Sequence, residues 1–211
     1  MQQGRFITFE GGEGAGKSTQ LKRLVARLET GGREVVATRE PGGSPGAESI
    51  RDIVLRGAAD RWSPVTETLL MYAARRDHVE RVIRPALARG AWVVCDRFAD
   101  STRAYQGAAG GTAPALIAAL ETHILEDTRP DLTLIFDLPV AVGLERAHAR
   151  AGAEMRFESK GHAFHERLRE GFLAIARAEP ARCAVIDATG SLDAVEARVW
   201  AAVDGHFGGH D

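Results

Sequence analysis

Cysteine, metal-ligand clusters and long apolar runs are scarce in this 211-residue chain. The two cysteines, Cys95 and Cys183, each lie alone in an apolar run, which predicts buried thiols and no metal-binding spacing. No apolar run approaches the length of a membrane-spanning helix. The first strand-like run begins so close to the N-terminus that we expect no signal peptide. These absences favour a cytoplasmic protein with no membrane partner.

Charge of one sign is also lacking, because 27 Lys and Arg residues are balanced by 29 Asp and Glu residues. The formal net charge of −2 gives no indication of a broad surface for nucleic acid or anionic lipid. Hydrophobic residues make up 45% of the chain, an ordinary value for a globular protein. We therefore expect residues 1–211 to form a single domain that binds no nucleic acid.

One glycine-rich segment fits the pattern G-x-x-x-x-G-K-[ST] of a phosphate-binding loop: Gly11-Gly12-Glu13-Gly14-Ala15-Gly16-Lys17-Ser18. Glycines let successive backbone N–H groups turn inward around an anion. Lys17 is expected to reach the β- and γ-phosphates, and the Ser18 hydroxyl offers an oxygen to Mg²⁺. An apolar run at 5–10 and a helical pattern at 19–28 supply the strand and helix that flank such a loop. The motif predicts binding of a nucleoside triphosphate with Mg²⁺, but it does not identify the phosphate acceptor.

Apolar strand-like runs alternate with helical patterns along the whole chain. The expected strands are 5–10, 34–38, 91–95, 131–136 and 184–186. The expected helices are 19–28, 47–55, 67–87, 114–125, 139–149, 164–178 and 192–203, followed by a frayed tail at 205–211. This alternation predicts an α/β fold with a five-stranded parallel sheet and helices on both faces.

Charged residues follow the expected strands, at the edge of a parallel sheet where ligands bind. Arg39 follows the second strand, Asp96 and Arg97 end the third, and Asp137 and Asp187 follow the fourth and fifth. Asp96 is in the usual place for a second Mg²⁺ ligand. Arg97 could clamp an acceptor phosphate with its planar guanidinium, or the two residues could form a surface ion pair.

Three further segments suggest a site less strongly. Arg75 follows two alanines on the expected long helix, which leaves room for a flat ligand. Residues 100–106 form a polar run with one aromatic side chain. Residues 147–162 contain spaced cations around a glycine and could be a lid that carries charge onto a transferring phosphoryl group. Each segment could equally be solvent-exposed.

Taken together, the motifs resemble those of the thymidylate kinase family. The matching segments are Phe9-Glu10-Gly11-Gly12-Glu13-Gly14-Ala15-Gly16-Lys17-Ser18-Thr19, Thr38-Arg39-Glu40-Pro41-Gly42-Gly43, Tyr72-Ala73-Ala74-Arg75, Asp96-Arg97-Phe98, Ala104-Tyr105-Gln106-Gly107, Pro130-Asp131-Leu132-Thr133-Leu134 and Asp187-Ala188-Thr189. They occur in the family's order and span essentially the whole chain. The phosphate loop is shared by many families, whereas the segments at 38–43 and 104–107 are far more specific.

The resemblance implies a P-loop nucleoside monophosphate kinase fold, phosphorylation of dTMP to dTDP by ATP with Mg²⁺, and a homodimer. It implies ATP binding by Gly11, Gly12, Glu13, Gly14, Ala15, Gly16, Lys17, Ser18, Thr19 and Arg150. It implies dTMP binding by Arg39, Arg51, Met71, Arg75, Arg97, Thr102, Tyr105 and Gln106. Lys17, Glu13, Arg97 and the lid residue Arg156 would be catalytic, and Ser18 and Asp96 would bind the metal.

Within dTMP binding the implied roles differ. Arg39 and Arg97 would hold the acceptor phosphate, and Arg75 would bind the thymine edge with Thr102 and Gln106 closing the base pocket. Tyr105 would crowd the 2′ position of the sugar and favour deoxyribose.

Two features distinguish this chain within the family. The variable positions of the phosphate loop carry no basic residue, which resembles the bacterial branch in which lid arginines assist transfer. Met71 stands where the family commonly has Phe, four residues before the thymine-binding arginine. Methionine covers a base less rigidly than an aromatic ring does, and Tyr72 could compensate.

Two other functions fit the phosphate loop. The chain could be a kinase of another nucleoside monophosphate, in which case the residues of the base pocket would discriminate. It could instead be a nucleotide-dependent switch or ATPase that transfers phosphate only to water. The arginine-lined edge of the sheet argues against the second function.

Overall fold

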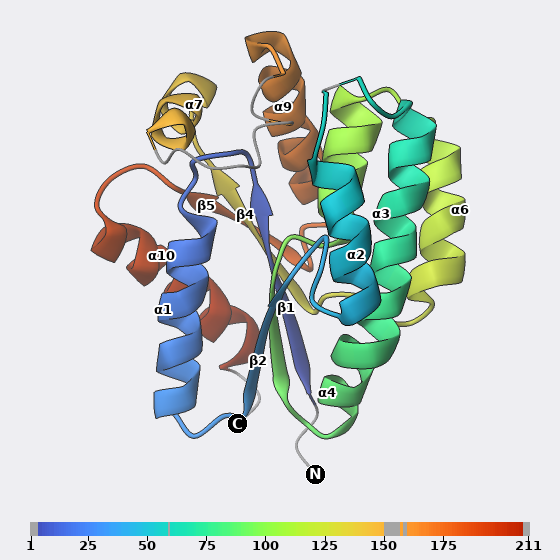
Figure 1. Cartoon of the computed structure of the whole chain (residues 1–211). Coiled ribbons are helices and arrows are strands. Elements are labelled where there is room, and N and C mark those ends of the chain that lie inside the picture. The colour runs from blue at the N-terminus through green and yellow to red at the C-terminus, as the bar shows by residue number, and fades with distance from the viewer. Residues whose placement is uncertain (1–3, 59, 150–156, 158–159, 209–211) are drawn as a thin grey trace.

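The computed structural model describes residues 4–58, 60–149, 157 and 160–208, in which five parallel strands form one sheet (Figure 1). The strands are β1 (Arg5–Gly11), β2 (Val35–Arg39), β3 (Trp92–Asp96), β4 (Leu132–Asp137) and β5 (Cys183–Asp187). Their order in the sheet is β2-β3-β1-β4-β5. This arrangement confirms the expected α/β fold with a five-stranded parallel sheet.

β1 is the central strand, and its side chains are buried on both faces of the sheet. Phe6, Ile7 and Phe9 are completely buried, as the near-continuous apolar run of this strand requires. The register pairs Phe9 with Asp96 and Gly11 with Phe136. The phosphate loop therefore begins directly beside the carboxyl ends of β3 and β4.

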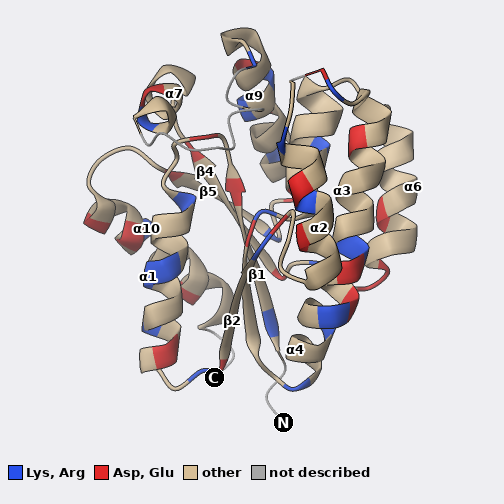
Figure 2. Cartoon of the chain, in the orientation of Figure 1, with Lys and Arg blue, Asp and Glu red and all other residues tan. Residues whose placement is uncertain are grey.

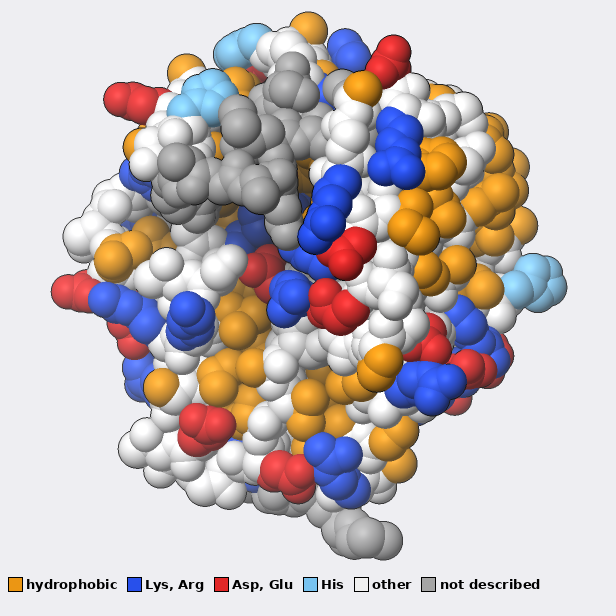
Figure 3. All heavy atoms as spheres, viewed as in Figure 1, with side chains coloured by type: hydrophobic (Ala, Val, Ile, Leu, Met, Phe, Trp, Pro, Cys, Tyr) orange, Lys and Arg blue, Asp and Glu red, His pale blue; other side chains and the backbone are white. Residues whose placement is uncertain are grey.

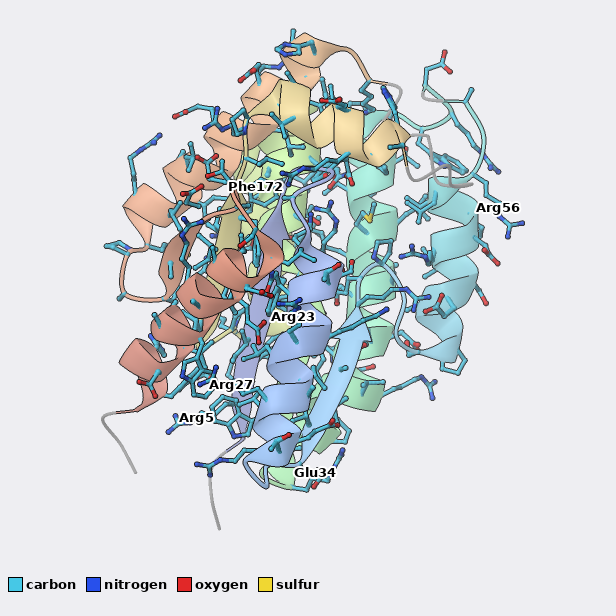
Figure 4. All side chains as sticks on the ribbon, turned by 90° about the vertical axis from the view of Figure 1, so that its left-hand side faces the viewer. Arg5, Arg23, Arg27, Glu34, Arg56 and Phe172 are labelled. Carbon is cyan, nitrogen blue, oxygen red and sulfur yellow. The ribbon has the colours of Figure 1, made fainter. Side chains whose placement is uncertain are left out.

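Two helices, α1 (Lys17–Thr30) and α10 (Leu192–Phe207), cover one face of the sheet (Figure 1). Arg23 projects from α1 toward α10 (Figure 4), where its Nη1 donates to Asp193 Oδ1 at 2.6 Å and Glu196 Oε2 at 2.5 Å. These contacts add to an apolar seam between the two helices.

The expected frayed tail is wrong for residues 205–208. α10 continues to Phe207, which is only 8% exposed and packs edge-on against Trp92 with ring centroids 5.0 Å apart. Arg5 also lies over the Phe207 ring, at 5.3 Å. Burial of one aromatic side chain thus outweighs the low helix propensity of the glycines around it.

Helices on the opposite face are α2 (Pro45–Leu55), α3 (Pro64–His78), α6 (Pro114–Leu125) and α9 (His162–Ala178), while α7 (Val140–His148) lies near the carboxyl ends of the strands (Figure 1). α2, α3 and α6 each begin with proline, whose fixed φ suits the first helical turn. Ser63 also caps α3, because its Oγ accepts from the Thr66 N–H at 3.1 Å.

The helix expected at 67–87 is longer and less regular than the sequence indicated. It starts at Pro64 because of the Ser63 cap, and it passes through a π-helical turn, η1 (Val79–Ile83), into α4 (Arg84–Ala88). Side-chain periodicity predicts a helical path here but cannot distinguish a π turn from an α turn.

A helical segment at 99–109 was not expected. It consists of α5 (Ala99–Thr102) followed by a π-helical stretch, η2 (Arg103–Ala109). The sequence does not indicate this helix, because Asp100, Thr102 and Gln106 are polar yet buried. The buried face of the helix therefore shows no apolar residues at helical spacing.

The two cysteines are both unpaired, and Cys95 is buried in β3 as expected. Cys183 is only half-buried, because β5 is an edge strand. No helix among the described residues combines the length and apolar character that crossing a membrane requires.

Candidate active site

The phosphate loop connects β1 to α1 and uses glycine where the backbone requires it. Gly14 and Gly16 have φ values of 68° and 82°, which other residues rarely adopt. Lys17 Nζ donates to the carbonyl oxygens of Gly11 at 3.0 Å and Gly12 at 2.6 Å. Burial, with the nearby Arg97 charge, lowers the pKa of Lys17 to about 8. The Lys17 side chain thus lies against its own loop, where it is expected to contact a bound phosphate.

The expected metal ligands lie against each other. Ser18 Oγ donates to Asp96 Oδ2 at 2.6 Å, because the β1–β3 pairing brings the end of β3 beside the first turn of α1. A hydroxyl and a carboxylate are hard oxygen ligands of the kind that Mg²⁺ prefers. The described residues contain no group of three or more His, Cys, Asp or Glu side chains placed to hold a metal ion.

Arg97 lies between the phosphate loop and the segment 99–109. Its φ of 71° is unusual for a residue other than glycine and marks a sharp turn directly after β3. Its Nη1 donates to the Gly11 carbonyl oxygen at 3.0 Å, and its Nη2 donates to Glu13 Oε1 at 3.0 Å. Burial opposes the charge, yet Tyr105 and Glu13 hold the pKa of Arg97 above its usual value.

Glu13 is the acidic member of this group. Burial would raise its pKa, but the charges of Arg97 and Lys17 hold the pKa at about 2. Glu13 Oε1 also accepts from the Tyr105 hydroxyl at 2.5 Å. The carboxylate therefore joins the phosphate loop to the aromatic residue that is expected to contact the sugar.

Arg75 is almost fully buried on α3 and is held by three acceptors. Its Nε donates to Glu40 Oε2 at 2.7 Å, its Nη1 to Thr102 Oγ1 at 3.1 Å and its Nη2 to the Phe98 carbonyl oxygen at 3.0 Å. A guanidinium carries five N–H donors, so two remain for a ligand. Arg75 and Thr102, both expected in the base pocket, are thus brought into direct contact.

The support behind Arg75 was missed in the sequence. Glu40 Oε1 also lies 2.9 Å from His78 Nδ1, and the other ring nitrogen of His78 lies 2.7 Å from Thr38 Oγ1. His78 and Glu40 are 0% and 5% exposed. In the sequence, Glu40 is a charged residue of the motif at 38–43 and His78 lies in the expected helix at 67–87. Neither position by itself indicates that the two side chains form a buried pair.

Gln106 has a comparable hidden partner. Its Nε2 donates to Glu67 Oε1 at 2.8 Å, and both side chains are buried. Tyr72, which could have compensated for Met71, is not among the described residues that line the same cavity as Met71; its hydroxyl donates to Glu121 Oε1 at 3.3 Å, and its ring lies 4.7 Å from the Arg75 guanidinium. The two side chains differ in this way because consecutive helical residues point in different directions.

These side chains line two adjoining cavities. Seven of the eight residues expected to bind dTMP line one cavity of about 150 Å³: Arg51, Met71, Arg75, Arg97, Thr102, Tyr105 and Gln106. The eighth, Arg39, lines a polar cavity of about 220 Å³ together with Glu13, Gly14, Ala15, Gly16, Lys17, Ser18 and Asp96. Glu13, Glu40, Arg51 and Arg97 line both cavities.

Charged side chains of both signs gather at this edge of the sheet. Figure 2 shows acidic and basic positions close together where β2 ends, between the sheet and α2. Arg39 Nη2 donates to Glu48 at 3.0 and 3.1 Å, and Arg51 Nη1 donates to the Pro41 carbonyl oxygen at 2.6 Å. In Figure 3 such side chains surround the centre of the visible face.

One residue of the expected lid, Phe157, adds an aromatic side chain to the cavity lining, which was not predicted from the sequence. Phe157 is buried, lines the 150 Å³ cavity and packs edge-on against Tyr105 with centroids 5.5 Å apart. Lys160 Nζ lies 5.3 Å from the centre of the same ring. Arg150 and Arg156, the lid arginines, lie outside the described residues.

A family model, curated protein sequences and a solved structure that resemble this chain all carry the same description. The family described as thymidylate kinase matches residues 9–199. A thymidylate kinase of Caulobacter vibrioides is 71% identical over 199 residues, which cover 94% of this chain and 95% of that protein. A thymidylate kinase of Nitrobacter winogradskyi is 57% identical over 204 residues, which cover 96% and 89%. The crystal structure of thymidylate kinase from Ehrlichia chaffeensis has a TM-score of 0.76 and 34% identity, covering 95% of this chain and 99% of that one.

Proposed function

The chain belongs to the thymidylate kinase family, and we propose that it transfers the γ-phosphoryl group of ATP to dTMP, giving ADP and dTDP. The terminal P–O bond of ATP breaks, and an oxygen of the dTMP 5′-phosphate forms the new bond to phosphorus. The observation that carries the proposal is the pair of adjoining cavities, which meet at Glu13 and Arg97. One cavity has the phosphate loop and the other the expected base-binding side chains.

Positioning and charge neutralisation would account for most of the catalysis. The acceptor phosphate is already an oxygen nucleophile, so no dedicated general base is required. Lys17 would hold the donor phosphates, while Arg39 and Arg97 would hold the acceptor phosphate. Each of these cations is now paired with a carboxylate or carbonyl group of the protein. Substrate phosphates would replace those partners with stronger anionic ones.

We assign Mg²⁺ to Ser18 and Asp96, whose hydroxyl and carboxylate fit its preference for oxygen. When bound, the ion would neutralise charge on the donor phosphates. Asp96 holds the Ser18 hydroxyl at the start of α1, which keeps both oxygens beside the phosphate loop.

The base pocket would read thymine through Arg75, Thr102 and Gln106. Arg75 is locked by Glu40, so its remaining donors are fixed in direction rather than free to rotate. Met71 would cover one face of the base. Tyr105, held by Glu13, would crowd the 2′ carbon of the sugar.

The remaining assignments follow the family. The whole chain would act as one kinase domain in the cytoplasm, without a nucleic-acid or membrane partner. Arg150 would lie against adenine and Arg156 would assist transfer from a lid at 147–162.

We also propose a homodimer formed through the outer surface of α2 and α3. Val65 and Leu69 on α3 are 45% and 48% exposed, and Ile53 on α2 is 42% exposed. Hydrophobic side chains gather over this part of the visible face in Figure 3. Other apolar side chains between residues 69 and 87 belong to the core, since Met71, Val79 and Ile83 are buried.

The test is ADP release from ATP and Mg²⁺ with dTMP, dUMP, UMP, dCMP, dGMP or dAMP as acceptor. We expect a strong preference for dTMP and slow hydrolysis without an acceptor. Activity spread over several monophosphates would identify a broader kinase. Rapid ADP release without any acceptor would identify an ATPase and overturn the proposal.

A further inference from the structure

α7 packs directly onto the phosphate loop, backbone against backbone (Figures 1 and 4). A Cβ atom built on Gly143, in the middle of α7, would lie 2.5 Å from the carbonyl oxygen of Glu13. From the other side, a Cβ atom built on Gly14 would lie 2.0 Å from the carbonyl oxygen of Gly143. Both distances are too short for any side chain, so the contact requires glycine on both partners.

The reasons for glycine differ at the two positions. Gly14 has a φ of 68°, so its backbone conformation alone disfavours a side chain. Gly143 lies within the regular helix α7, and its N–H donates to the Pro139 carbonyl oxygen at 3.1 Å. Alanine is a better helix former than glycine at such a position. Only the close approach to Glu13 explains a glycine at 143.

Glu13 connects α7 to the rest of the site. Its carbonyl oxygen touches Gly143, while its carboxylate accepts from Arg97 and Tyr105. Its neighbours in the chain are the loop residues whose N–H groups would face donor phosphates. A shift at this contact would therefore move the loop as well as the groups at the junction of the two cavities.

We propose that Gly143 is a positioning residue for phosphoryl transfer, because it allows the backbone of α7 to contact the phosphate loop and so to fix the position and orientation of that loop. Ordinary van der Waals contact begins at 3.4 Å, so a methyl group 2.5 Å from the Glu13 oxygen would force α7 and the loop apart by about 0.9 Å. The inference rests on the proposed function for its kinetic readout but not for nucleotide binding.

Three Gly→Ala variants separate loop positioning from general packing. Gly143→Ala is the test. Gly205→Ala in α10 is the open-space control, since nothing lies within 4 Å of the added Cβ atom. Gly171→Ala in α9 is the packing control, because its Cβ atom would lie 2.8 Å from the Ala108 side chain and not against the loop. The measurements are the Kd for ADP by calorimetry, kcat, both KM values and the Tm.

We expect Gly143→Ala to weaken ADP binding about tenfold and to lower kcat by about tenfold to a hundredfold, since displacements near 1 Å have effects of that order. Gly205→Ala should leave the Kd for ADP, kcat and both KM values unchanged and should raise the Tm slightly, because alanine is the better helix former. Gly171→Ala should lower the Tm and leave the Kd for ADP unchanged. Because Ala108 lies on η2 with Tyr105, any kinetic effect of Gly171→Ala should fall on dTMP.

The opposite result would overturn the inference: a lower Tm for Gly143→Ala with wild-type ADP affinity and kinetics. If wild-type protein binds ADP but does not phosphorylate dTMP, the proposed function fails while the Kd comparison still tests Gly143. If the Gly143→Ala variant does not fold, the test is instead amide hydrogen exchange of the wild-type protein, measured with and without ADP. ADP should then slow exchange in α7 and not in α6, and equal exchange in α7 with and without ADP would contradict the contact's role.

Discussion

Two cavities adjoin at Glu13 and Arg97: the 220 Å³ cavity around the phosphate loop, and the 150 Å³ cavity beside Arg75, which we call the acceptor cavity because the proposed function places dTMP there. The phosphate loop is made of consecutive backbone groups, whereas the acceptor cavity is made of side chains from separate elements. The loop needs only its glycines, Lys17 and the start of α1. The acceptor cavity needs α3 and the segment 99–109 to be held at a fixed separation. The loop is therefore locally encoded, whereas the cavity depends on tertiary structure.

The supports of the two regions differ in the same way. Lys17 donates hydrogen bonds to carbonyl groups of its own loop, whereas Arg75 and Gln106 each donate to a buried carboxylate from another element. Removing one partner of a buried ion pair leaves an uncompensated charge in the interior, at a cost of about 3–5 kcal/mol. Substitutions in the loop should therefore affect chemistry, while those in the cavity should affect both substrate binding and stability.

The largest effect is expected from Lys17→Ala. Removing the cation that would neutralise the transferring phosphoryl group should lower kcat by about 10³-fold or more, with little change in Tm. The matched control is Lys22→Ala, which alters an exposed lysine one turn further along α1. Turnover near the wild-type value for Lys17→Ala would remove Lys17 from the mechanism.

The next effect tests the acceptor cavity. Arg75→Ala should raise the KM for dTMP roughly 10- to 100-fold, because a charged hydrogen-bond donor is lost, and should leave the KM for ATP nearly unchanged. Arg76→Ala is the matched control, since Arg76 lies on the outer side of the same helix and pairs with Glu80 and Glu126. Equal increases in both KM values would place the base pocket elsewhere.

Arg75→Ala should also destabilise the protein, which Lys17→Ala should not. The double variant Arg75→Ala/Glu40→Gln removes the orphaned carboxylate and should recover part of the lost stability without recovering the KM for dTMP. Recovery of the KM would mean that Arg75 acts only through packing.

The same contrast explains how far the sequence could be interpreted. The phosphate loop, the five strands and the charged residues at the strand ends could be predicted because each is a local pattern. Met71, Arg75 and Thr102 could be assigned to the cavity only through the family resemblance. Their spacing alone gave a weak indication, since Arg75 could equally have been solvent-exposed.

Features that depend on burial of polar groups could not be predicted. Asp100 interrupts any apolar pattern in the segment 99–109, yet it is buried because Arg182 donates to both of its oxygens, at 2.7 and 2.9 Å. His78 and Glu40 were overlooked for the same reason. Sequence periodicity detects apolar faces, and a face made of paired charges produces no such signal.

Glu10 connects the two regions, and its titration gives a smaller, pH-dependent effect. It is the last residue but one of β1, next to the start of the loop, and its carboxylate accepts from the Phe98 N–H at 2.7 Å and the Ser101 hydroxyl at 2.6 Å. Burial, reinforced by the Asp100 charge, raises its pKa from 4.5 to about 7. The folded state therefore binds this proton more tightly than the unfolded state does.

It follows that the stability from Glu10 is fully present below pH 4.5 and is lost as the pH rises toward 7, by at most about 3 kcal/mol. Glu10→Gln should abolish this slope in the free energy of unfolding measured by denaturant between pH 5 and 7. Glu13 and Lys17, with pKa values of about 2 and 8, titrate outside that range. An unchanged slope in Glu10→Gln would assign the titration to another group.

The smallest effect is expected from Met71→Phe, which sharpens the acceptor cavity without touching its charges. Met71 lines the 150 Å³ cavity beside Arg75 and Tyr105, and Tyr72 points away toward Glu121. An aromatic ring at 71 would cover the base more rigidly and gain about 0.5–1 kcal/mol, so the KM for dTMP should fall roughly twofold to fivefold. The KM for dUMP should fall by the same factor, because stacking acts on the ring face that both bases share. A rise in KM for dTMP alone would show instead that methionine leaves room for the thymine methyl group, and that this position contributes to substrate choice.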